Sequence, residues 1–262
     1  MTAPPAAPAA PSGRGLLAGK TVLVTAAAGT GIGFATARRC VEEGARVLLS
    51  DAHARRTAEA AERLGEIAGE PVAFRVCDVT REEQVRALVD GAVADMGRID
   101  VLVNNAGLGG FARVTEMTDE QWARVIDVTL TGTFRMLRAV LPHMLARRSG
   151  TIVNNASVLG WRAQAGQAHY AAAKAGVMAL TRCTAIEAAE AGVRVNAVAP
   201  SLALHEHLSK VTPAGLLEDL AVREAFGRAA EPWEVANVIV FLASDYASYM
   251  TGEVVAVSSQ HP

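Results

Sequence analysis

Short apolar runs rich in β-branched residues alternate along the chain with longer helical segments, and this alternation constrains the fold more than any other feature. The runs have strand length and lack alternating polar residues, which indicates strands buried on both faces. Strands separated by helices of about ten or more residues form parallel βαβ units. The sequence therefore predicts an α/β fold, a doubly wound parallel sheet with helices on both faces, with strands near residues 20–25, 46–50, 72–76, 100–107, 150–157, 193–200 and 252–258.

Two helix starts carry the spacing of a capping box, in which two side chains three residues apart bond each other's backbone. Thr80 and Glu83 have this spacing, and so do Thr118 and Gln121. We expect both boxes to form, the second at the start of a long helix that runs toward Ala146.

No break in composition divides the chain, so residues 16–262 are expected to form one domain. Residues 1–15 are rich in Ala and Pro and lack a signal-peptide pattern, which predicts a disordered arm. The three cysteines, Cys40, Cys77 and Cys183, lie far apart, as expected for free thiols in a reducing cytosol. No apolar run reaches the roughly 18 residues of a membrane span. A net charge of −2 favours neither nucleic acid nor membrane as a partner, and we expect a cytoplasmic protein.

A glycine-rich turn follows the first strand, in the stretch VTAAAGTGIGFATARR at Val24–Arg39. Gly29, Gly31 and Gly33 are spaced at twos and so differ from the dinucleotide fingerprint G-x-G-x-x-G. The strand before the turn and the helix after it still provide the context that the fingerprint needs. Backbone N–H groups of such a turn and the helix N-terminus can bind a pyrophosphate, so we expect a dinucleotide here.

Asp51 ends the second strand, 18 residues after Gly33. A carboxylate at this place can accept hydrogen bonds from ribose hydroxyls and repels a 2′-phosphate, which favours NAD over NADP. Thr30 in the turn is uncharged, which agrees with NAD. Three basic side chains follow Asp51, namely His53, Arg55 and Arg56. Either they attract a phosphate group of the cofactor, or they form the solvated first turn of a helix.

Tyr170 and Lys174 lie four residues apart in the helical stretch HYAAAKAG, so they share one helix face. A nearby ammonium lowers the pKa of a phenol, and the pair is therefore a candidate acid and base for converting a hydroxyl into a carbonyl. Ser157 precedes Tyr170 by 13 residues at the end of the fifth strand. Its hydroxyl is either a group that polarises a substrate oxygen or a helix cap.

These motifs resemble the short-chain dehydrogenase/reductase family. The glycine-rich turn, NNAG at Asn104–Gly107, Ser157, and YAAAK at Tyr170–Lys174 occur in this order, and the likeness extends from Leu16 to the C-terminus. The resemblance implies a Rossmann-type sheet of about seven strands in one dinucleotide-binding catalytic domain. It also implies hydride transfer to or from a nicotinamide cofactor, and a homo-oligomer, a tetramer or dimer built on the long helices.

The resemblance also assigns roles to residues. Tyr170 would be the acid or base, Lys174 would bind the nicotinamide ribose and lower the pKa of Tyr170, and Ser157 would orient the substrate oxygen. The residues expected to bind the cofactor are Thr25, Ala28, Gly29, Thr30, Gly31, Ile32, Asp51, Asp78, Val79, Asn105, Ala106, Gly107, Tyr170, Lys174, Pro200 and Leu202.

The sequence departs from the family pattern at the turn and in the relay. Ala26 stands where the family has its first glycine, and the turn is one residue longer, so we expect Gly29 to adopt the special backbone conformation. Thr129 stands where the family has an Asn that binds a proton-relay water. We expect the Thr129 hydroxyl to bind that water instead.

Further departures lie after the sixth and seventh strands. Ser201 replaces the glycine of a usual Pro-Gly, and His205 replaces a Thr that normally helps hold the carboxamide. Ser258-Ser259-Gln260 replaces a usual Asp-Gly-Gly. The pair His205 and His207 has no third ligand nearby, and neither it nor His261 predicts a metal site. The residues expected around the substrate are Leu108, Trp161, Gln164, Gln167 and His205. For the two glutamines, an ordinary position in a loop is the alternative explanation.

Longer stretches, among them NNASVLGWRAQAGQAHYAAAKAG, resemble an actinobacterial subgroup that acts late in steroid catabolism. Its substrates are remnants of the C and D rings carried as coenzyme A thioesters. The resemblance implies an NAD-dependent dehydrogenase that interconverts a ring-borne secondary alcohol and a ketone on such an indene-carboxyl-CoA. An NADPH-dependent 3-oxoacyl thioester reductase and a nucleotide-binding scaffold without turnover stay open as alternatives.

Overall fold

A computed structural model of the chain describes residues 7–204 and 215–259. Seven strands form one sheet in the order β3-β2-β1-β4-β5-β6-β7, and every neighbouring pair is parallel. The predicted doubly wound sheet is confirmed. Its strands are β1 (Thr21–Thr25), β2 (Arg46–Asp51), β3 (Ala73–Val76), β4 (Val101–Asn104), β5 (Gly150–Asn155), β6 (Val193–Pro200) and β7 (Val254–Val257).

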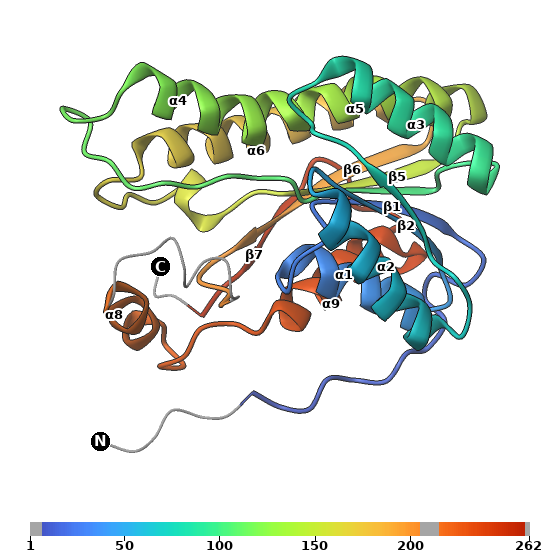
Figure 1. The fold of residues 1–262 in the computed structure, drawn as a ribbon, viewed down its shortest axis with the longest axis horizontal. Coiled ribbons are helices and arrows are strands. Elements are labelled where there is room, and N and C mark those ends of the chain that lie inside the picture. The colour runs from blue at the N-terminus through green and yellow to red at the C-terminus, as the bar shows by residue number, and fades with distance from the viewer. Residues whose placement is uncertain (1–6, 205–214, 260–262) are drawn as a thin grey trace.

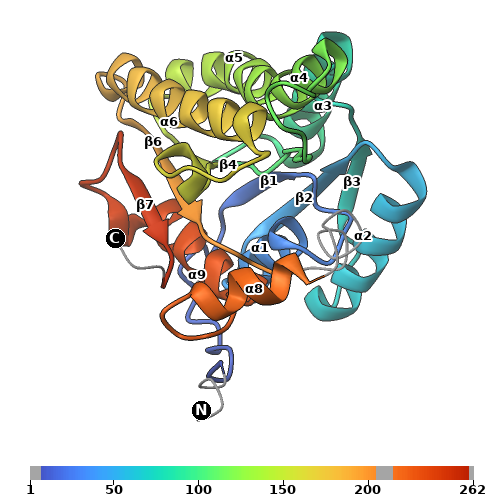
Figure 2. The same cartoon turned by 90° about the vertical axis from the view of Figure 1, so that its left-hand side faces the viewer.

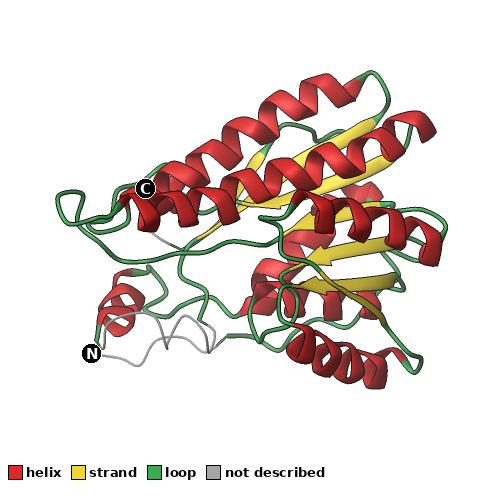
Figure 3. Ribbon diagram, turned by 45° about the horizontal axis from the view of Figure 1, so that its top comes forward, coloured by secondary structure: helices red, strands yellow, loops and turns green. Residues whose placement is uncertain are grey.

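Helices cover both faces of the sheet (Figure 1 and Figure 3). One face carries α1 (Ile32–Glu42), α2 (Ala54–Ala68) and α9 (Pro232–Ala243), whose buried residues share one hydrophobic cluster. The other face carries α3 (Glu82–Met96), α4 (Asp119–Ile126), α5 (Gly132–Arg147) and α6 (Ala168–Ala189), as Figure 2 shows. Three short turns and one short helix complete the order, η1 (Asp127–Thr131), η2 (Val158–Gly160), η3 (Asp245–Ala247) and α8 (Leu216–Arg223).

Alternate side chains of a central strand enter different cores. Val22 and Val24 of β1 belong to the cluster under α1 and α9, whereas Leu23 belongs to the cluster under α3 and α5. All three side chains are fully buried. Burial on both faces explains why these strands read as continuous apolar runs in the sequence.

The strand order reverses between β1 and β4. β1 pairs with β2 on one side and with β4 on the other, so the crossover helices leave toward opposite faces. In open parallel sheets such a reversal leaves a crevice at the carboxyl ends of the strands, where ligands bind. The fold therefore places the glycine-rich turn after β1 at the mouth of that crevice.

Only one of the two predicted capping boxes forms. Thr118 and Gln121 make both reciprocal hydrogen bonds at the start of α4. The Thr80 hydroxyl instead donates to Oδ1 of Asp78 at 2.8 Å, and α3 begins after Arg81. The helix expected to run from Thr118 toward Ala146 contains the wider turn η1, and α8 was not expected from the sequence.

The described part of the N-terminal arm contacts the end of α1. The guanidinium of Arg39 donates to the carbonyl oxygens of Pro11 and Ser12. The carboxylate of Glu43 accepts hydrogen bonds from the backbone N–H groups of Arg14 and Leu16 at 2.8 and 2.9 Å. Residues 1–6 lie outside the described residues. Within residues 7–204 and 215–259, we find no helix with the length and apolar character needed to cross a membrane.

Candidate active site

The glycine-rich turn is built on a left-handed alanine. Ala26 has φ of 51°, whereas Gly29 lies outside the left-handed region, so the expectation that Gly29 adopts the special conformation is wrong. The cause is a contact from another strand. The amide of Asn105 donates to the carbonyl oxygens of Thr25 at 3.3 Å and Ala26 at 3.1 Å, which fixes the chain direction before the turn reaches its glycines.

Gly33 is required by close approach. A Cβ atom at Gly33 would overlap the carbonyl oxygen of Ala26 and lie 2.5 Å from Nδ2 of Asn105. Both of these atoms belong to the turn and its support, so neither has room to move. Gly29 and Thr30 lie exposed at the tip of the turn.

Replacing Ala26 with Gly should stabilise the protein by about 1 kcal/mol, because an L-residue in the left-handed region costs roughly 1–2 kcal/mol and glycine does not. Urea unfolding measures this difference. Ala27→Gly is the matched control, since Ala27 is fully buried and lies outside the left-handed region, and it should be destabilising. An Ala26→Gly protein less stable than the wild type would contradict the assignment of strain.

The start of α1 offers free backbone donors beside a carboxylate. Among the described residues, no side chain caps this helix at Gly31. Asp51 reaches the turn from β2, and its Oδ2 accepts a hydrogen bond from the N–H of Ala28 at 3.3 Å. Burial raises the pKa of Asp51, and hydrogen bonds from the backbone oppose that shift. The turn, the helix end and the carboxylate fit a dinucleotide with its pyrophosphate on α1 and its ribose near Asp51.

The other residues expected to bind a cofactor lie at the same edge. The backbone N–H of Cys77 donates to the carbonyl oxygen of Asp51, which holds Asp78 and the buried Val79 next to β2. The Thr25 hydroxyl accepts hydrogen bonds from the N–H groups of Asn105 at 2.9 Å and Ala106 at 3.1 Å. Pro200 ends β6. Ile32 is the first residue of α1, Gly107 is the third residue after β4, and Leu202 is the second residue after β6.

Ser157, Tyr170 and Lys174 come together as predicted. Ser157 directly precedes η2, and Tyr170 and Lys174 lie in the first two turns of α6. A hydrogen bond joins Ser157 to Tyr170, and Nζ of Lys174 lies 5.5 Å from the centre of the Tyr170 ring. The Ser157 hydroxyl also accepts from the N–H of Leu159 at 3.2 Å, so Ser157 is a cap as well as a partner of Tyr170.

Burial acts on both groups of the pair. It raises the pKa of Tyr170 to about 12, although the hydrogen bond to Ser157 lowers it. It lowers the pKa of Lys174 to about 7. The net shift of the Tyr170 pKa is upward because loss of solvation is its largest cause, and a lowering of that pKa by Lys174 stays a prediction. Tyr170 keeps its proton at neutral pH, which is the state of an acid that protonates a ketone.

Asn155 is a site residue that sequence reasoning missed. Its carbonyl oxygen accepts a hydrogen bond from Nζ of Lys174 at 2.5 Å. Its side-chain amide donates to Oδ1 of Asn105 at 2.8 Å, and Asn105 in turn binds the turn at Ala26. A continuous series of hydrogen bonds therefore joins Lys174 to the left-handed residue of the glycine-rich turn.

A second pair of amides lies on the opposite face of the sheet. Asn104 donates to Oδ1 of Asn154 at 2.9 Å, and Asn154 donates to the Thr181 hydroxyl of α6 at 2.9 Å. Asn104 and Asn154 are partners in the register of β4 and β5. The repeated Asn-Asn at the ends of two strands was the signal in the sequence, since register alone places the doublets side by side.

The Thr129 hydroxyl binds the backbone of a neighbouring loop. It accepts from the N–H of Leu108 at 3.0 Å and donates to the carbonyl oxygen of Leu108 at 3.1 Å. Thr129 lies in η1 and is fully buried. Because its one donor is used, Thr129 positions the loop at Leu108, and its role toward a relay water stays a prediction.

One of the expected substrate residues contacts this loop directly. Gln167 donates its side-chain amide to the carbonyl oxygen of Gly110 at 2.7 Å, so its donor holds the loop. Trp161 is 52% exposed at the end of η2, and Gln164 accepts a backbone hydrogen bond from Gln167. His205, with His207 and His261, lies outside the described residues. In the part of the chain that the structure describes, no group of His, Cys, Asp and Glu could hold a metal.

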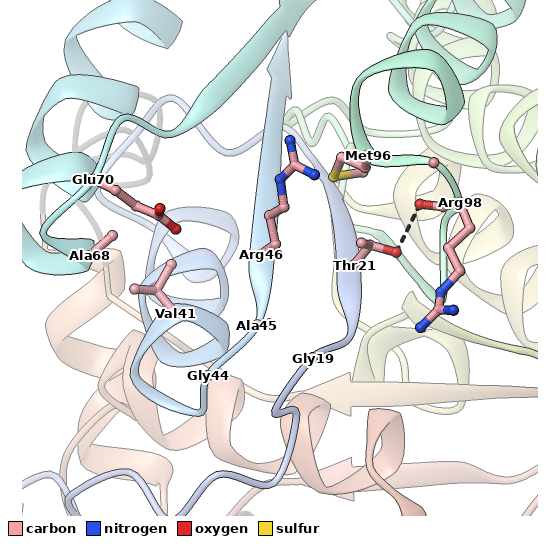
Figure 4. A pocket seen from close by; sticks show the side chains of 11 residues that line it. Gly19, Thr21, Val41, Gly44, Ala45, Arg46, Ala68, Glu70, Met96 and Arg98 are labelled. Carbon is pink, nitrogen blue, oxygen red and sulfur yellow. Dashed lines mark hydrogen bonds between the residues drawn. The ribbon is translucent and has the colours of Figure 1, made fainter.

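A cavity of about 720 Å3 lies at the opposite edge of the sheet (Figure 4). Thr21 and Arg46, the first residues of β1 and β2, line it together with Gly44 and Arg98. The Thr21 hydroxyl donates to the carbonyl oxygen of Arg98 at 2.8 Å. The cavity is remote from the carboxyl ends of the strands and belongs to no part of the candidate active site.

Comparison with known proteins agrees with this geometry. A family model described as enoyl-(acyl carrier protein) reductase matches residues 26–259. A Mycobacterium tuberculosis (strain ATCC 25618 / H37Rv) protein, named (5R,7aS)-5-hydroxy-7a-methyl-1-oxo-2,3,5,6,7,7a-hexahydro-1H-indene-carboxyl-CoA reductase, is 63% identical and covers 98% of each chain. A solved short chain dehydrogenase from Mycobacterium smegmatis is 58% identical at a TM-score of 0.87, covering 98% of this chain and 99% of that chain. NAD+-bound xylitol dehydrogenase is 34% identical at a TM-score of 0.87, covering 93% and 99%.

Proposed function

Because the chain belongs to the short-chain dehydrogenase/reductase family and is one of its oxidoreductases, we propose that it interconverts a ring-borne secondary alcohol and a ketone with NAD as coenzyme. The observation that carries the proposal is the meeting of Ser157, Tyr170 and Lys174 beside the turn that Asp51 contacts. An acid, a hydroxyl donor and a dinucleotide cradle at one strand edge are the parts that such a reaction needs.

A nicotinamide dinucleotide supplies or accepts the hydride in this family. The residues that would hold it are the turn at Ala28–Ile32, Asp51, the pair Asp78 and Val79, and the loop Asn105–Gly107. Lys174 would hold the nicotinamide ribose, with Pro200 and Leu202 beyond it. These residues lie at one edge of the sheet, and their donors and acceptors match a pyrophosphate and two riboses.

The chemistry at the substrate belongs to Ser157 and Tyr170. Both hydroxyls hold the substrate oxygen, and Ser157 keeps Tyr170 aimed by the hydrogen bond between them. In the reducing direction Tyr170 donates its proton to that oxygen, and in the oxidising direction it accepts the proton back. Lys174, held by the carbonyl oxygen of Asn155, stabilises the phenolate that each donation leaves behind.

The substrate we propose is an indene-carboxyl-CoA with a hydroxyl or ketone on the ring. Support comes from the name of the 63% identical M. tuberculosis protein, which specifies this kind of molecule. Trp161 and Phe111 are about half exposed, at 52% and 51%, and offer apolar surface for a fused ring. The thioester would extend away from the ring into solvent.

We propose further that the protein is a cytoplasmic homo-oligomer, a tetramer or dimer. Cys40, Cys77 and Cys183 are free thiols, which suits a reducing compartment. Ile186 of α6 is 80% exposed, and Phe134 of α5 is 41% exposed, so these long helices carry apolar side chains for a second copy to cover.

The coenzyme experiment tests the proposed function. Initial rates with the indene-carboxyl-CoA ketone should favour NADH over NADPH by at least about 10-fold in kcat/KM, because the Asp51 carboxylate repels a 2′-phosphate. Asp51→Asn keeps an acceptor for the N–H of Ala28 but removes the negative charge. This variant should therefore show a smaller ratio of kcat/KM for NADH to kcat/KM for NADPH. Faster turnover with NADPH, or with a linear 3-oxoacyl-CoA in place of the ring ketone, would contradict the proposal and favour a 3-oxoacyl thioester reductase.

A further inference from the structure

A buried carboxylate outside the catalytic group joins three separate segments of the chain. Glu224 directly follows α8 and is only 3% exposed. Its Oε2 accepts a hydrogen bond from the Ser201 hydroxyl at 3.2 Å and another from the Ser259 hydroxyl at 3.1 Å. Ser201 is the first residue after β6, and Ser259 is the second after β7. A buried carboxylate needs such partners, so these segments are held where it lies.

Backbone hydrogen bonds close the same junction. The N–H of Ser201 donates to the carbonyl oxygen of Val257 at 3.1 Å, and the N–H of Ala225 donates to the carbonyl oxygen of Ser259 at 2.7 Å. Ser201 therefore bonds the end of β7 through its backbone and Glu224 through its side chain, whereas Ser259 bonds the segment after α8 through both. The end of α8, the end of β6 and the segment after β7 form one connected unit.

The two serines are also two of the departures from the family pattern. The resemblance to the family implies glycine at the positions of Ser201 and Ser259, and glycine has no hydroxyl to donate. Two unrelated positions, 58 residues apart in the sequence, thus supply donors to one carboxylate. Glu224 gives both substitutions a single physical reason.

The junction lies next to the candidate active site. Ser201 follows Pro200, whose carbonyl oxygen lies 3.5 Å from the Ser157 hydroxyl. Beyond Ser201 the chain pairs with the segment that returns from α8, since the N–H of Ala230 donates to the carbonyl oxygen of Leu202 at 2.8 Å. In Figure 1, α8 lies beyond the ends of β6 and β7. The position of α8 therefore bears directly on the side of the site where Ser157 meets its substrate.

We propose that Glu224 is a positioning residue, which holds α8 against the end of β6 through Ser201 and Ser259 and so shapes the substrate side of the active site. The inference rests on the proposed function for its kinetic consequence. Glu224 acts through other groups and takes no part in proton or hydride transfer. Loss of its contacts should therefore raise KM for the ring substrate much more than it lowers kcat.

A double-mutant cycle on the full chain tests this coupling. Ser259→Ala should raise KM for the ring ketone about 5-fold, with the Kd of NADH changed less than about 2-fold. Glu224→Ala should raise KM at least as much, and Ser259→Ala should then add nothing, because the carboxylate that accepts the hydrogen bond of the Ser259 hydroxyl is gone. A KM unchanged by Ser259→Ala, or a full-sized effect of Ser259→Ala in the Glu224→Ala protein, would overturn the proposal.

Hydrogen exchange separates this proposal from the proposed function. In Ser259→Ala, the backbone amides of α8 (Leu216–Arg223) should exchange at least about 5-fold faster, while those of α6 keep their wild-type rates. This result is expected whatever the substrate is. Unchanged exchange in α8 would overturn the positioning role, whereas a wild-type protein that fails to turn over the ring ketone would overturn only the proposed function. Ser201→Ala, a mild change at the same carboxylate, should reproduce the faster exchange if Ser259→Ala folds poorly.

Discussion

Replacing Tyr170 with Phe should lower kcat for reduction of the ring ketone by at least about 100-fold. The change removes one oxygen from a partly buried ring and leaves the packing of α6 in place. In the wild type, burial holds the pKa of Tyr170 at about 12, so the phenol carries its proton at neutral pH and can donate it to the substrate. Phe has no proton to donate. The Kd of NADH, measured by titration, should stay within about 2-fold of the wild type.

The chain offers a matched control for this change. Its two other tyrosines, Tyr246 and Tyr249, are exposed at the surface, and Tyr249→Phe removes the same hydroxyl far from the site. That control should retain wild-type kcat. Turnover in Tyr170→Phe above about a tenth of the wild-type rate would remove Tyr170 from the role of acid.

The second large effect is a change of stability with pH that depends on Lys174. The lysine is 3% exposed, and burial lowers its pKa from 10.5 to about 7. Between these values the unfolded chain binds the proton that the folded chain has released, so stability rises with pH across this window. Lys174→Met lacks the group. From about pH 7 to about pH 9.5, the wild type should gain on the order of 3 kcal/mol in free energy of unfolding relative to Lys174→Met.

Urea unfolding of both proteins at the two pH values measures that gain. The range ends below pH 10 because Tyr170, whose pKa is raised to about 12, lowers the stability of the folded protein above that point. Lys20→Met is the control for loss of a lysine, since Lys20 forms an ion pair with the exposed Asp245 at the surface. A difference between wild type and Lys174→Met that stays constant with pH would show that Lys174 is not held in a poorly solvated site.

The sheet could be predicted from the sequence because its cause is spread along the whole chain. Every strand of a parallel sheet covered by helices needs a run of apolar residues, and each run is visible on its own. The first and last residues of a helix or strand depend on a few local hydrogen bonds, so the sequence predicts them less accurately than it predicts the strands themselves. The Thr118 box forms as its spacing predicts. The Thr80 box does not form, because α3 has Arg81 as its N-cap, which places Thr80 one residue before the cap.

The catalytic group could be predicted in part, because the meeting of two of its members has a local cause. Tyr170 and Lys174 meet because four residues make about one helical turn, which is a local fact. Their pKa shifts were not predictable, since these depend on how many distant segments exclude water from both groups. The left-handed Ala26 and the role of Asn155 were also missed, because each depends on a contact with Asn105 from a neighbouring strand.

The most direct test of the account is the fate of a labelled hydride. NADH carrying two deuterium atoms at C4 of the nicotinamide is incubated with the protein and the indene-carboxyl-CoA ketone, and the product alcohol is analysed by mass spectrometry and NMR. Each molecule of product alcohol should carry one deuterium, bound to the carbon that carries the new hydroxyl, and Tyr170→Phe should form almost no product in the same time. An alcohol without deuterium at that carbon, or no conversion of the ketone by the wild type, would contradict it.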